Sequence, residues 1–174
     1  MDPAEYLAFV PLLIYGLGLA DLFSEWKRFL SKEAFYWPYA ITTLILTETG
    51  IYNVFIYSEL VNRFPGTPYL DYLIDLSLPV VFILITEAFT PDKGEETEKA
   101  FQKRKSTVFP LFAVFIGCHF LYAFNEFSYT YLIRIGAILS CLFIAYSKKN
   151  WAIYLLLAQW VILFILRINF NSLP

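Results

Sequence analysis

The stretch WPYAITTLILTETGIYNVFIYSEL, residues 37–60, decides the fold of this chain. It is long and apolar, and Glu48 is the one charged residue near its middle. About 20 consecutive apolar residues suffice for a helix to cross the ~30 Å hydrocarbon core of a bilayer. A strand in lipid would leave its backbone N–H and C=O groups unpaired unless it closed into a barrel, and the alternating pattern of barrel strands is absent. The stretch therefore predicts a transmembrane α-helix.

The composition of the whole chain extends this interpretation. Its 174 residues are 59% hydrophobic, 20% aromatic and 16% charged, whereas soluble domains are about half apolar and about a quarter charged. One core cannot hide such a surplus, because a folded domain of this size leaves much of its surface in contact with solvent. The surplus must therefore face lipid, which excludes an ordinary soluble enzyme. We expect one transmembrane domain over residues 1–174, with no soluble catalytic domain.

Five further apolar runs flank the central one, and one long charged loop interrupts them. The runs are residues 6–23, 69–89, 108–124, 128–146 and 151–168, and the loop is residues 90–106. Glu95 and Lys99 are spaced i, i+4, as on a solvated helix face, so we interpret the charged loop as an extension of the fourth helix, with a site for a partner or for anionic lipid as the alternative. Together with residues 37–60, these runs predict an all-α, polytopic membrane protein, a compact bundle of six transmembrane helices.

Lysine and arginine are distributed unevenly between the two sides that six spans create. Ten lie in connections on one side: Lys27, Arg28, Lys32, Lys93, Lys99, Lys103, Arg104, Lys105, Lys148 and Lys149. The other side has Arg63, Arg134 and Arg167. Because cytoplasmic loops are enriched in Lys and Arg, we predict that both termini are non-cytoplasmic and that loop 90–106 is cytoplasmic. The acidic N-terminus lacks the features of a cleaved signal peptide, so we expect the first span to be retained, in a bacterial inner membrane.

A weak internal repeat accompanies this plan. The four positions Pro11, Leu12, Gly18 and Leu22 recur at a fixed offset as Pro110, Leu111, Gly117 and Leu121. A true repeat would relate helices one to three to helices four to six in opposite orientations, and such 3+3 inverted repeats are common in transporters. Chance is the alternative explanation for so few matches.

Glu48 carries the most information about function, because an exposed charge at this depth would cost several kcal/mol or more. It must be paired, protonated or in contact with water. Thr42, Thr49 and Asn53 recur at helical spacing and form a polar stripe, and Glu48 lies one residue away from it. The stripe is interpreted either as the lining of a narrow wet path or as hydrogen bonding between helices, worth about 1 kcal/mol per group.

Two further polar residues reach a similar depth, His119 in the fourth run and Gln159 in the sixth. If these helices meet the second one, Glu48 and His119 could share a proton, since a carboxylate raises the pKa of a nearby histidine. A neutral imidazole that makes one hydrogen bond in a packed interior is the alternative. The predicted ion pathway comprises Glu48, Thr49, Asn53, His119 and Gln159.

A second set of charged residues falls toward the predicted outer face. It comprises Asp71, Asp75, Glu126 and Arg134. Asp75 and Arg134 each lie roughly 10 Å inside their helix at 1.5 Å per residue, which makes them natural partners. This outer charged cluster is either a vestibule for a polar ligand or an ion-pair lock between helices three and five.

Metal, cofactor and nucleic-acid sites are not predicted. A single histidine, with Cys118 and Cys141 in separate apolar runs, does not supply the spacing of a zinc site. The sequence contains no P-loop, no nucleophile elbow and no dinucleotide fingerprint, and it has no basic stripe for nucleic acid. The expected partners are the lipid bilayer and either a membrane partner subunit or further copies of this chain.

Three functions are compatible with these features. The leading hypothesis is a small transporter or channel-like subunit for a proton, an ion or a small polar solute. The second is a non-catalytic membrane subunit or sensor that assembles with a partner protein through loop 90–106 or a helix face. The third, an intramembrane lipid-modifying enzyme, ranks last because the acidic motif that would bind Mg²⁺ is absent.

Overall fold

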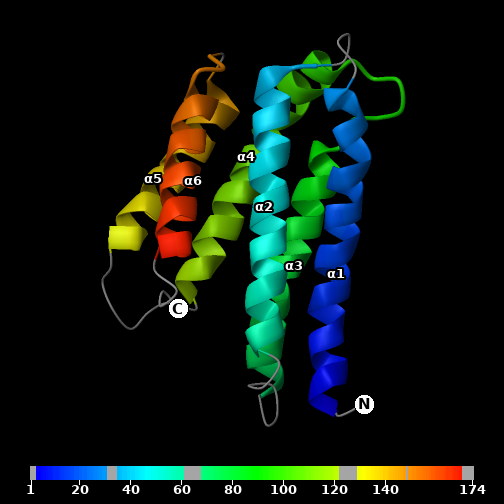
Figure 1. Cartoon of the computed structure of the whole chain (residues 1–174), viewed down its shortest axis with the longest axis vertical. Helices are drawn as coiled ribbons and strands as arrows, with labels where there is room; N and C mark the ends of the chain where they lie inside the picture. Colours follow the sequence, from blue (N-terminus) through cyan, green and yellow to red (C-terminus); the bar gives the residue numbers. More distant parts are fainter. Residues whose placement is uncertain (1–2, 31–34, 61–67, 122–128, 148, 170–174) are drawn as a thin grey trace. The chain divides into compact units, whose positions relative to one another are not determined.

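The computed structural model describes residues 3–30, 35–60, 68–121, 129–147 and 149–169. Six α-helices lie in these ranges: α1 (Pro3–Glu25), α2 (Trp37–Leu60), α3 (Tyr69–Phe89), α4 (Thr97–Cys118), α5 (Tyr129–Tyr146) and α6 (Ala152–Asn169). Two short 3₁₀ helices, Trp26–Phe29 and His119–Leu121, extend α1 and α4 (Figure 1). The all-α class is confirmed for the described part of the chain.

Three of these helices are long and apolar enough to cross a membrane. The candidate spans are Phe9–Phe29, Trp37–Tyr57 and Tyr69–Phe89. Each has 21 residues, or about 32 Å of helix at 1.5 Å per residue. The apolar parts of α5 and α6, Tyr131–Tyr146 and Ala152–Leu166, are shorter. Length and composition thus indicate an integral membrane protein.

The fourth helix begins earlier than the apolar pattern predicts. The fourth apolar run starts at residue 108, whereas α4 starts at Thr97, so the charged part of loop 90–106 extends the fourth helix, in agreement with the i, i+4 spacing of its charges. Residues 97–106 are mostly good helix formers, with one acidic residue, Glu98, in the first turn and four basic residues after it. A helical turn in water needs no apolar residue, so hydrophobic periodicity misses its start.

The chain divides into two compact units, Met1–Arg104 and Lys105–Pro174. The division falls inside α4, between Arg104 and Lys105, and not between α3 and α4, where the proposed repeat has its boundary. The environment of the matched glycines also differs. A Cβ on Gly18 would lie 3.0 Å from the Phe82 ring, whereas a Cβ on Gly117 would meet nothing within 4 Å. The inverted repeat therefore stays a prediction.

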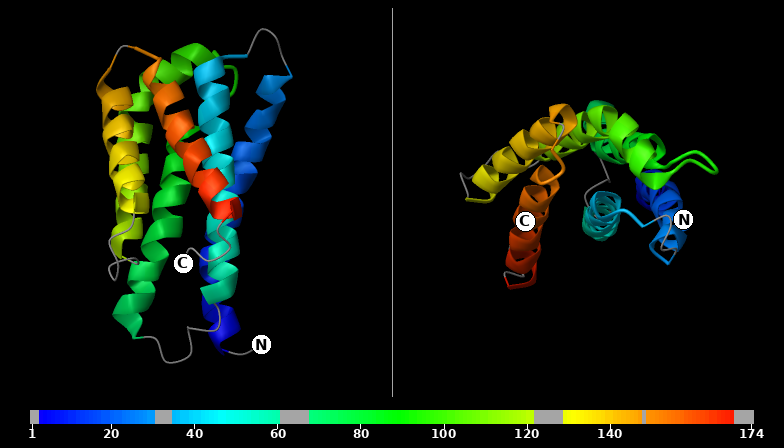
Figure 2. Two further views of the ribbon diagram at one scale, coloured as in Figure 1. Left: turned by 60° about the vertical axis from the view of Figure 1, so that its left-hand side comes forward. Right: turned by 90° about the horizontal axis from the view of Figure 1, so that it is seen from above.

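In the first unit, α1 packs against both α2 and α3 (Figure 2), and aromatic side chains fill the space between them. The buried ring of Tyr15 lies 5.2 Å from that of Phe82 and 5.6 Å from that of Tyr57, measured between centroids. Gly50 lets α2 come close to this cluster, because a Cβ there would lie 2.6 Å from Phe82 Cζ and 2.8 Å from Leu19 Cδ2. Phe82 therefore fills the space between α1 and α2 at the level of Gly18 and Gly50.

In the second unit, α5 and α6 pack side by side (Figure 2). The buried residues of these two helices include small and branched ones: Ala137, Cys141, Ile144, Ala152, Ile153 and Leu156. Gly136 on α5 leaves room for a polar side chain of α6, because a Cβ there would lie 3.0 Å from Gln159 Nε2.

Candidate functional site

The polar stripe predicted on α2 is buried. Thr42, Thr49 and Asn53 are all shielded from solvent. The Thr42 hydroxyl donates to the Pro38 carbonyl oxygen at 2.8 Å, and Asn53 Nδ2 donates to the Thr49 carbonyl oxygen at 2.8 Å. These hydrogen bonds run back along α2, so they satisfy donors of the stripe within the helix itself.

Glu48 lies at the edge of the buried side of α2. Leu44 and Ile51, one turn before and one turn after it, are 47% and 51% exposed, whereas Ile45 is buried. Successive residues of an α-helix are turned by about 100°, so Glu48 is separated from the Thr49 stripe by roughly that angle. Its side chain is half-buried and takes part in an interaction.

A second buried row of hydroxyls, which the sequence analysis did not single out, lies on another side of α2 and on α3. Thr43 donates to the Tyr39 carbonyl oxygen at 2.9 Å, and Thr86 donates to the Ile83 carbonyl oxygen at 3.0 Å. The buried Thr47 hydroxyl has no hydrogen-bond partner among the described residues. The first unit therefore contains more buried polar groups than the spacing of Thr42, Thr49 and Asn53 reveals.

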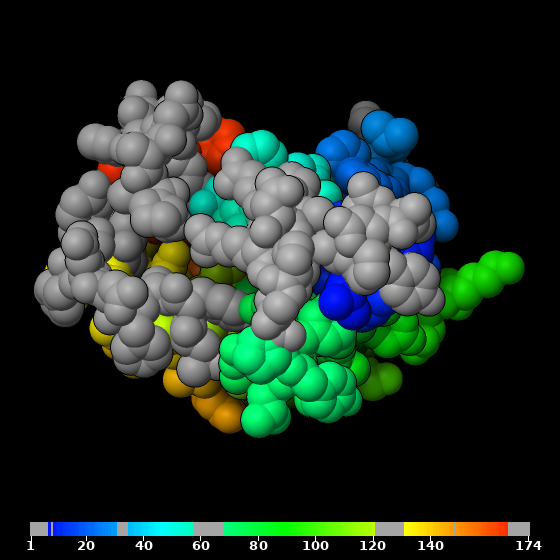
Figure 3. Space-filling view, turned by 90° about the horizontal axis from the view of Figure 1, so that it is seen from below, coloured from blue at the N-terminus to red at the C-terminus, as the bar shows by residue number. Residues whose placement is uncertain are grey.

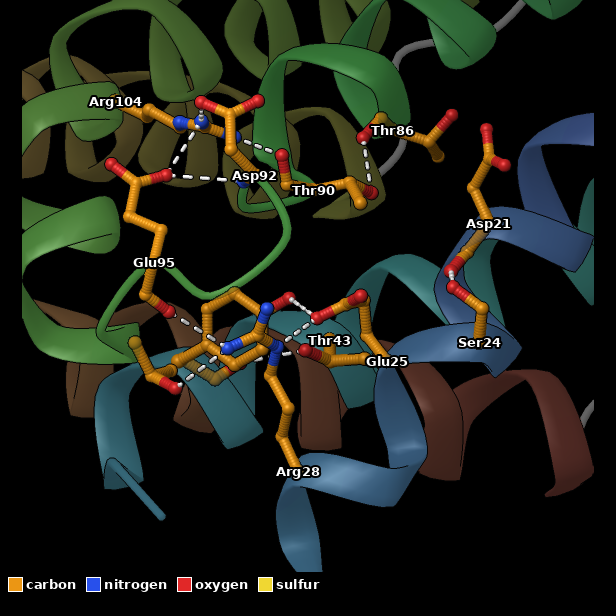
Figure 4. A network of polar contacts seen from close by, with 12 residues as sticks. Asp21, Ser24, Glu25, Arg28, Thr43, Thr86, Thr90, Asp92, Glu95 and Arg104 are labelled. Carbon is orange, nitrogen blue, oxygen red and sulfur yellow. Dashed lines mark hydrogen bonds and ion pairs between the residues drawn. The ribbon is translucent and has the colours of Figure 1, made fainter. Parts of the chain in front are cut away.

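A network of charged side chains closes the end of the first unit where α1 ends and α2 begins (Figure 4). Its centre is Glu25, which is 4% exposed. One carboxylate oxygen of Glu25 accepts hydrogen bonds from Arg28 Nε and, at 3.1 Å, from the Tyr39 hydroxyl. The Tyr39 ring stacks on Phe89 with 4.5 Å between centroids. A buried carboxylate with two donors joins the ends of α1, α2 and α3.

Two arginines fold the segment between α3 and α4 onto this end (Figure 4). Arg28 Nη1 donates to the Glu95 carbonyl oxygen at 3.1 Å and to Thr97 Oγ1 at 3.4 Å. Arg104 Nη2 lies 2.7 Å from both the Asp92 and the Glu95 carboxylates. We call Glu25, Arg28, Glu95 and Arg104 the arginine lock. Charged side chains of the predicted loop 90–106 are thus paired within the protein, so fewer of them are left to bind a partner.

The lock was missed because Glu25 lies at a helix end, where an acidic residue has no unusual sequence context. The i, i+3 spacing of Glu25 and Arg28 is a weak signal for an ion pair. Burial of that pair depends on Tyr39 and Glu95, which are distant in sequence.

Two lysines of this end show how the local environment changes the pKa. A hydrogen bond to the Glu96 carboxylate raises the pKa of the exposed Lys99 above 10.5, because it favours the ammonium form. Burial lowers the pKa of Lys105 below 10.5, although its Nζ donates to the Ser147 carbonyl oxygen at 2.7 Å. At Lys105 the loss of hydration therefore affects the pKa more than the hydrogen bond to the neutral Ser147 carbonyl oxygen does.

The second unit contains His119 and Gln159. His119 Nδ1 lies 3.0 Å from the Phe115 carbonyl oxygen, a contact in which Nδ1 would carry the proton. The Gln159 side-chain oxygen is buried and has no hydrogen-bond partner among the described residues. Glu48 belongs to the first unit and these two residues to the second, so their predicted convergence stays a prediction.

Three residues of the predicted outer charged cluster, Asp71, Asp75 and Arg134, lie in the described part of the chain. Asp71 is exposed in the first turn of α3, and Asp75 is half-buried one turn further on. The start of α3 forms the blue-green part of the face shown in Figure 3. The Tyr57 hydroxyl donates to the backbone carbonyl oxygen of Asp75. Arg134 is half-buried on α5. Glu126 lies outside the described residues, and the pairing of Asp75 with Arg134 stays a prediction.

In the described part of the chain, no three His, Cys, Asp or Glu side chains gather as a metal site would require. No protein-family model matches the chain, and searches of curated proteins and of solved structures found no match. The function must therefore be inferred from the geometry alone.

Proposed function

We propose that the chain crosses a bacterial inner membrane six times, with both termini on the non-cytoplasmic side. The three long apolar helices and the apolar character of α5 and α6 support this topology. The excess of Lys and Arg in alternate connections supports the orientation.

The topology is tested with single cysteines in a variant that lacks Cys118 and Cys141. A cysteine at Lys93 should react with a membrane-impermeant maleimide only after the cells are permeabilised. A cysteine at Asp71 should react in intact cells. The opposite pattern would invert the orientation, and equal labelling of both positions in intact cells would contradict the six-span plan.

We propose further that this protein is a small transporter or a channel-like subunit for a proton, an ion or a small polar solute. The observation that carries the proposal is the burial of several polar side chains on α2 on either side of Glu48: Thr42, Thr43, Thr47, Thr49 and Asn53. Thr42, Thr43 and Asn53 bond back to α2, whereas the buried Thr47 hydroxyl has no partner among the described residues and loses its hydration without replacement. Ionisable residues within membrane-spanning helices, such as Glu48, commonly mark paths for ions and solutes.

Flux measurements on the purified protein in proteoliposomes test this function. Glu48→Gln should reduce the flux, because it removes a charge at mid-membrane depth. Glu87→Gln is the matched control, since Glu87 is an exposed acid near the end of α3. Flux unchanged by Glu48→Gln, at equal amounts of folded protein, would remove Glu48 from the path.

Absence of flux in the wild-type protein would contradict transport altogether. If mild detergent then recovered a stoichiometric complex with another membrane protein, the alternative function, a non-catalytic subunit or sensor, would be supported. A homo-oligomer without flux would contradict both functions.

A further inference from the structure

The end of the first unit that contains the arginine lock also carries two pairs of exposed aromatic rings. The ring centroids of Phe23 and Trp26 are 5.5 Å apart, and those of Phe35 and Trp37 are 4.8 Å apart. Trp26 is 41% exposed and Trp37 is 63% exposed. A hydrogen bond of the lock joins the end of α1 to the start of α2, so both pairs belong to one end of the unit (Figure 1).

The exposed residues nearer the middle of the same helices are aliphatic. They are Leu13 and Leu17 on α1, and Leu44 and Ile51 on α2. Leucine and isoleucine face the hydrocarbon of a bilayer, whereas tryptophan collects at the headgroups, where its ring is apolar and its N–H can reach a polar group. The change from aliphatic side chains to tryptophan therefore marks the level at which α1 and α2 leave the hydrocarbon.

Lys27 is an exposed cation directly after Trp26. Within the described part of the chain it takes part in no ion pair. The carboxylate of its neighbour Glu25 is buried and accepts hydrogen bonds from Arg28 and from the Tyr39 hydroxyl. The charge of Lys27 is therefore left for an anion outside the protein.

The expected contact of Lys27 is local and does not depend on the net charge of this end. Glu87 and Glu98 are exposed as well, so the end is not strongly basic. A lysine beside tryptophan at the headgroup level can lay its apolar stem along the bilayer and extend its ammonium group to the lipid phosphates.

We propose that Trp26, Lys27 and Trp37 form a headgroup anchor. The two indole rings lie at the headgroup level of the bilayer, and the Lys27 ammonium group binds the phosphate of an anionic phospholipid. The anchor requires a membrane-inserted first unit and is independent of the proposed transport function. It also places Glu25 and Arg28 near the headgroups, where charged side chains cost less free energy than they do in hydrocarbon.

The depth of the anchor is tested by tryptophan fluorescence in bilayers of brominated phosphatidylcholine. Proteins with Trp26 or Trp37 as their single tryptophan should be quenched more by bromine in the upper part of the acyl chain than by bromine near its end. The matched control is Leu17→Trp in a protein without the native tryptophans. Leu17 is similarly exposed on α1 and lies about 13 Å deeper at 1.5 Å per residue, so the order should be reversed.

Two results of this experiment would overturn the anchor. One is stronger quenching of Trp26 and Trp37 by the deep bromine. The other is weak quenching of both by either lipid while Leu17→Trp is quenched, which would show that a protein partner covers the rings. If the single-tryptophan proteins fail to fold, the loss of shallow quenching from the wild type to Trp26→Phe decides the question.

The phosphate contact is tested in the protein whose single tryptophan is Trp26. Quenching by brominated phosphatidylglycerol is compared with quenching by brominated phosphatidylcholine. We expect a preference for phosphatidylglycerol of about fivefold, the effect of one lysine near an anionic surface. Lys27→Gln should abolish the preference. Lys99→Gln is the matched control and should keep it, because Lys99 is equally a surface lysine but pairs with Glu96 at 2.7 Å.

The absence of a preference, or a preference that Lys27→Gln leaves unchanged, would overturn the phosphate contact. An equal loss in Lys27→Gln and Lys99→Gln would overturn the assignment to Lys27. The flux measurements described above are separate from these readouts, so a failure of transport would leave the anchor in place.

Discussion

The two units of this protein differ in helix length and in the side chains that fill the space between their helices. Helices α1 to α3 have 21 to 24 residues, and α5 and α6 have 18 each, about 27 Å of helix. In the first unit a buried carboxylate is paired and an aromatic ring fills the space between two helices. In the second unit the space beside Gly136 holds the end of the Gln159 side chain. Buried polar groups without a partner among the described residues occur in both units, the Thr47 hydroxyl in the first and the Gln159 oxygen in the second.

This difference indicates in which unit substitutions should lower the free energy of unfolding most. A buried ion pair and close aromatic packing leave little freedom, so single substitutions in the first unit should cost much free energy of unfolding. Contacts that end in a flexible side chain can adjust, so substitutions in the second unit should cost less. The following predictions test that contrast, from the largest expected effect to the smallest.

The largest effect is expected from Arg28→Ala. It leaves the buried Glu25 carboxylate without its cationic partner and removes the contact to the Glu95 carbonyl oxygen. We expect a loss of about 3 kcal/mol in the free energy of unfolding, measured by denaturation in mild detergent. Lys99→Ala, which breaks the exposed pair with Glu96, should cost less than about 1 kcal/mol. Similar losses in both variants would mean that the lock does not stabilise the first unit.

The next effect is expected from Gly50→Ala. The new Cβ would lie 2.6 Å from Phe82 Cζ, so the ring must move. Overpacking of this kind costs about 2 kcal/mol. Gly16→Ala on α1 meets nothing within 4 Å and is the control, with no loss expected. Phe82→Leu should recover part of the stability of Gly50→Ala in a double-mutant cycle. A purely additive cycle would contradict the contact.

A smaller effect is expected from Gly136→Ala in the second unit. The new Cβ would lie 3.0 Å from Gln159 Nε2, the far end of a flexible side chain. That side chain can rotate away, so the loss should be under about 1 kcal/mol. A loss as large as that of Gly50→Ala would remove the contrast between the two units.

The smallest effect concerns the pH dependence at Lys105. Burial lowers the pKa of this group below 10.5 in the folded protein, so the folded state binds fewer protons there than the unfolded state. The free energy of unfolding then rises with pH between the pKa of Lys105 in the folded protein and about 10.5. Below that pH range the folded protein bears the full cost of burying the charged ammonium group. Relative to Lys105→Met, the wild type should therefore gain stability as the pH is raised through the window. A difference that does not vary with pH would contradict the lowered pKa.

Much of the fold could be predicted from hydrophobic runs. The predicted ranges 37–60 and 69–89 coincide with α2 and α3, because Pro and Gly between them interrupt both the apolar pattern and the helices. The apolar run 108–124 gives only the apolar part of α4, which starts at Thr97, because solvated helical turns do not need apolar residues; the charges of loop 90–106 indicate the extension. The burial of Thr42, Thr49 and Asn53 agrees with the predicted stripe, since all three lie on one side of a single helix.

The arginine lock could not be predicted in this way. Glu48 attracted attention because it interrupts an apolar run, yet Glu25 is the more deeply buried acid. Tyr39 and Glu25 are 14 residues apart, and Arg28 and Glu95 are 67 apart. No spacing rule connects such positions.

The amino-acid sequence alone predicts that long apolar helices enter a membrane and that eight of the 15 acidic residues lie in the first three of them. Both follow from composition along one segment, because transfer of a helix into lipid depends on its own side chains. Which acidic residue is buried, which glycines contact Phe82 and which hydroxyl groups are buried depends on the tertiary structure. Those properties depend on which faces of different helices meet, and the free energy of burial belongs to the contact rather than to either segment.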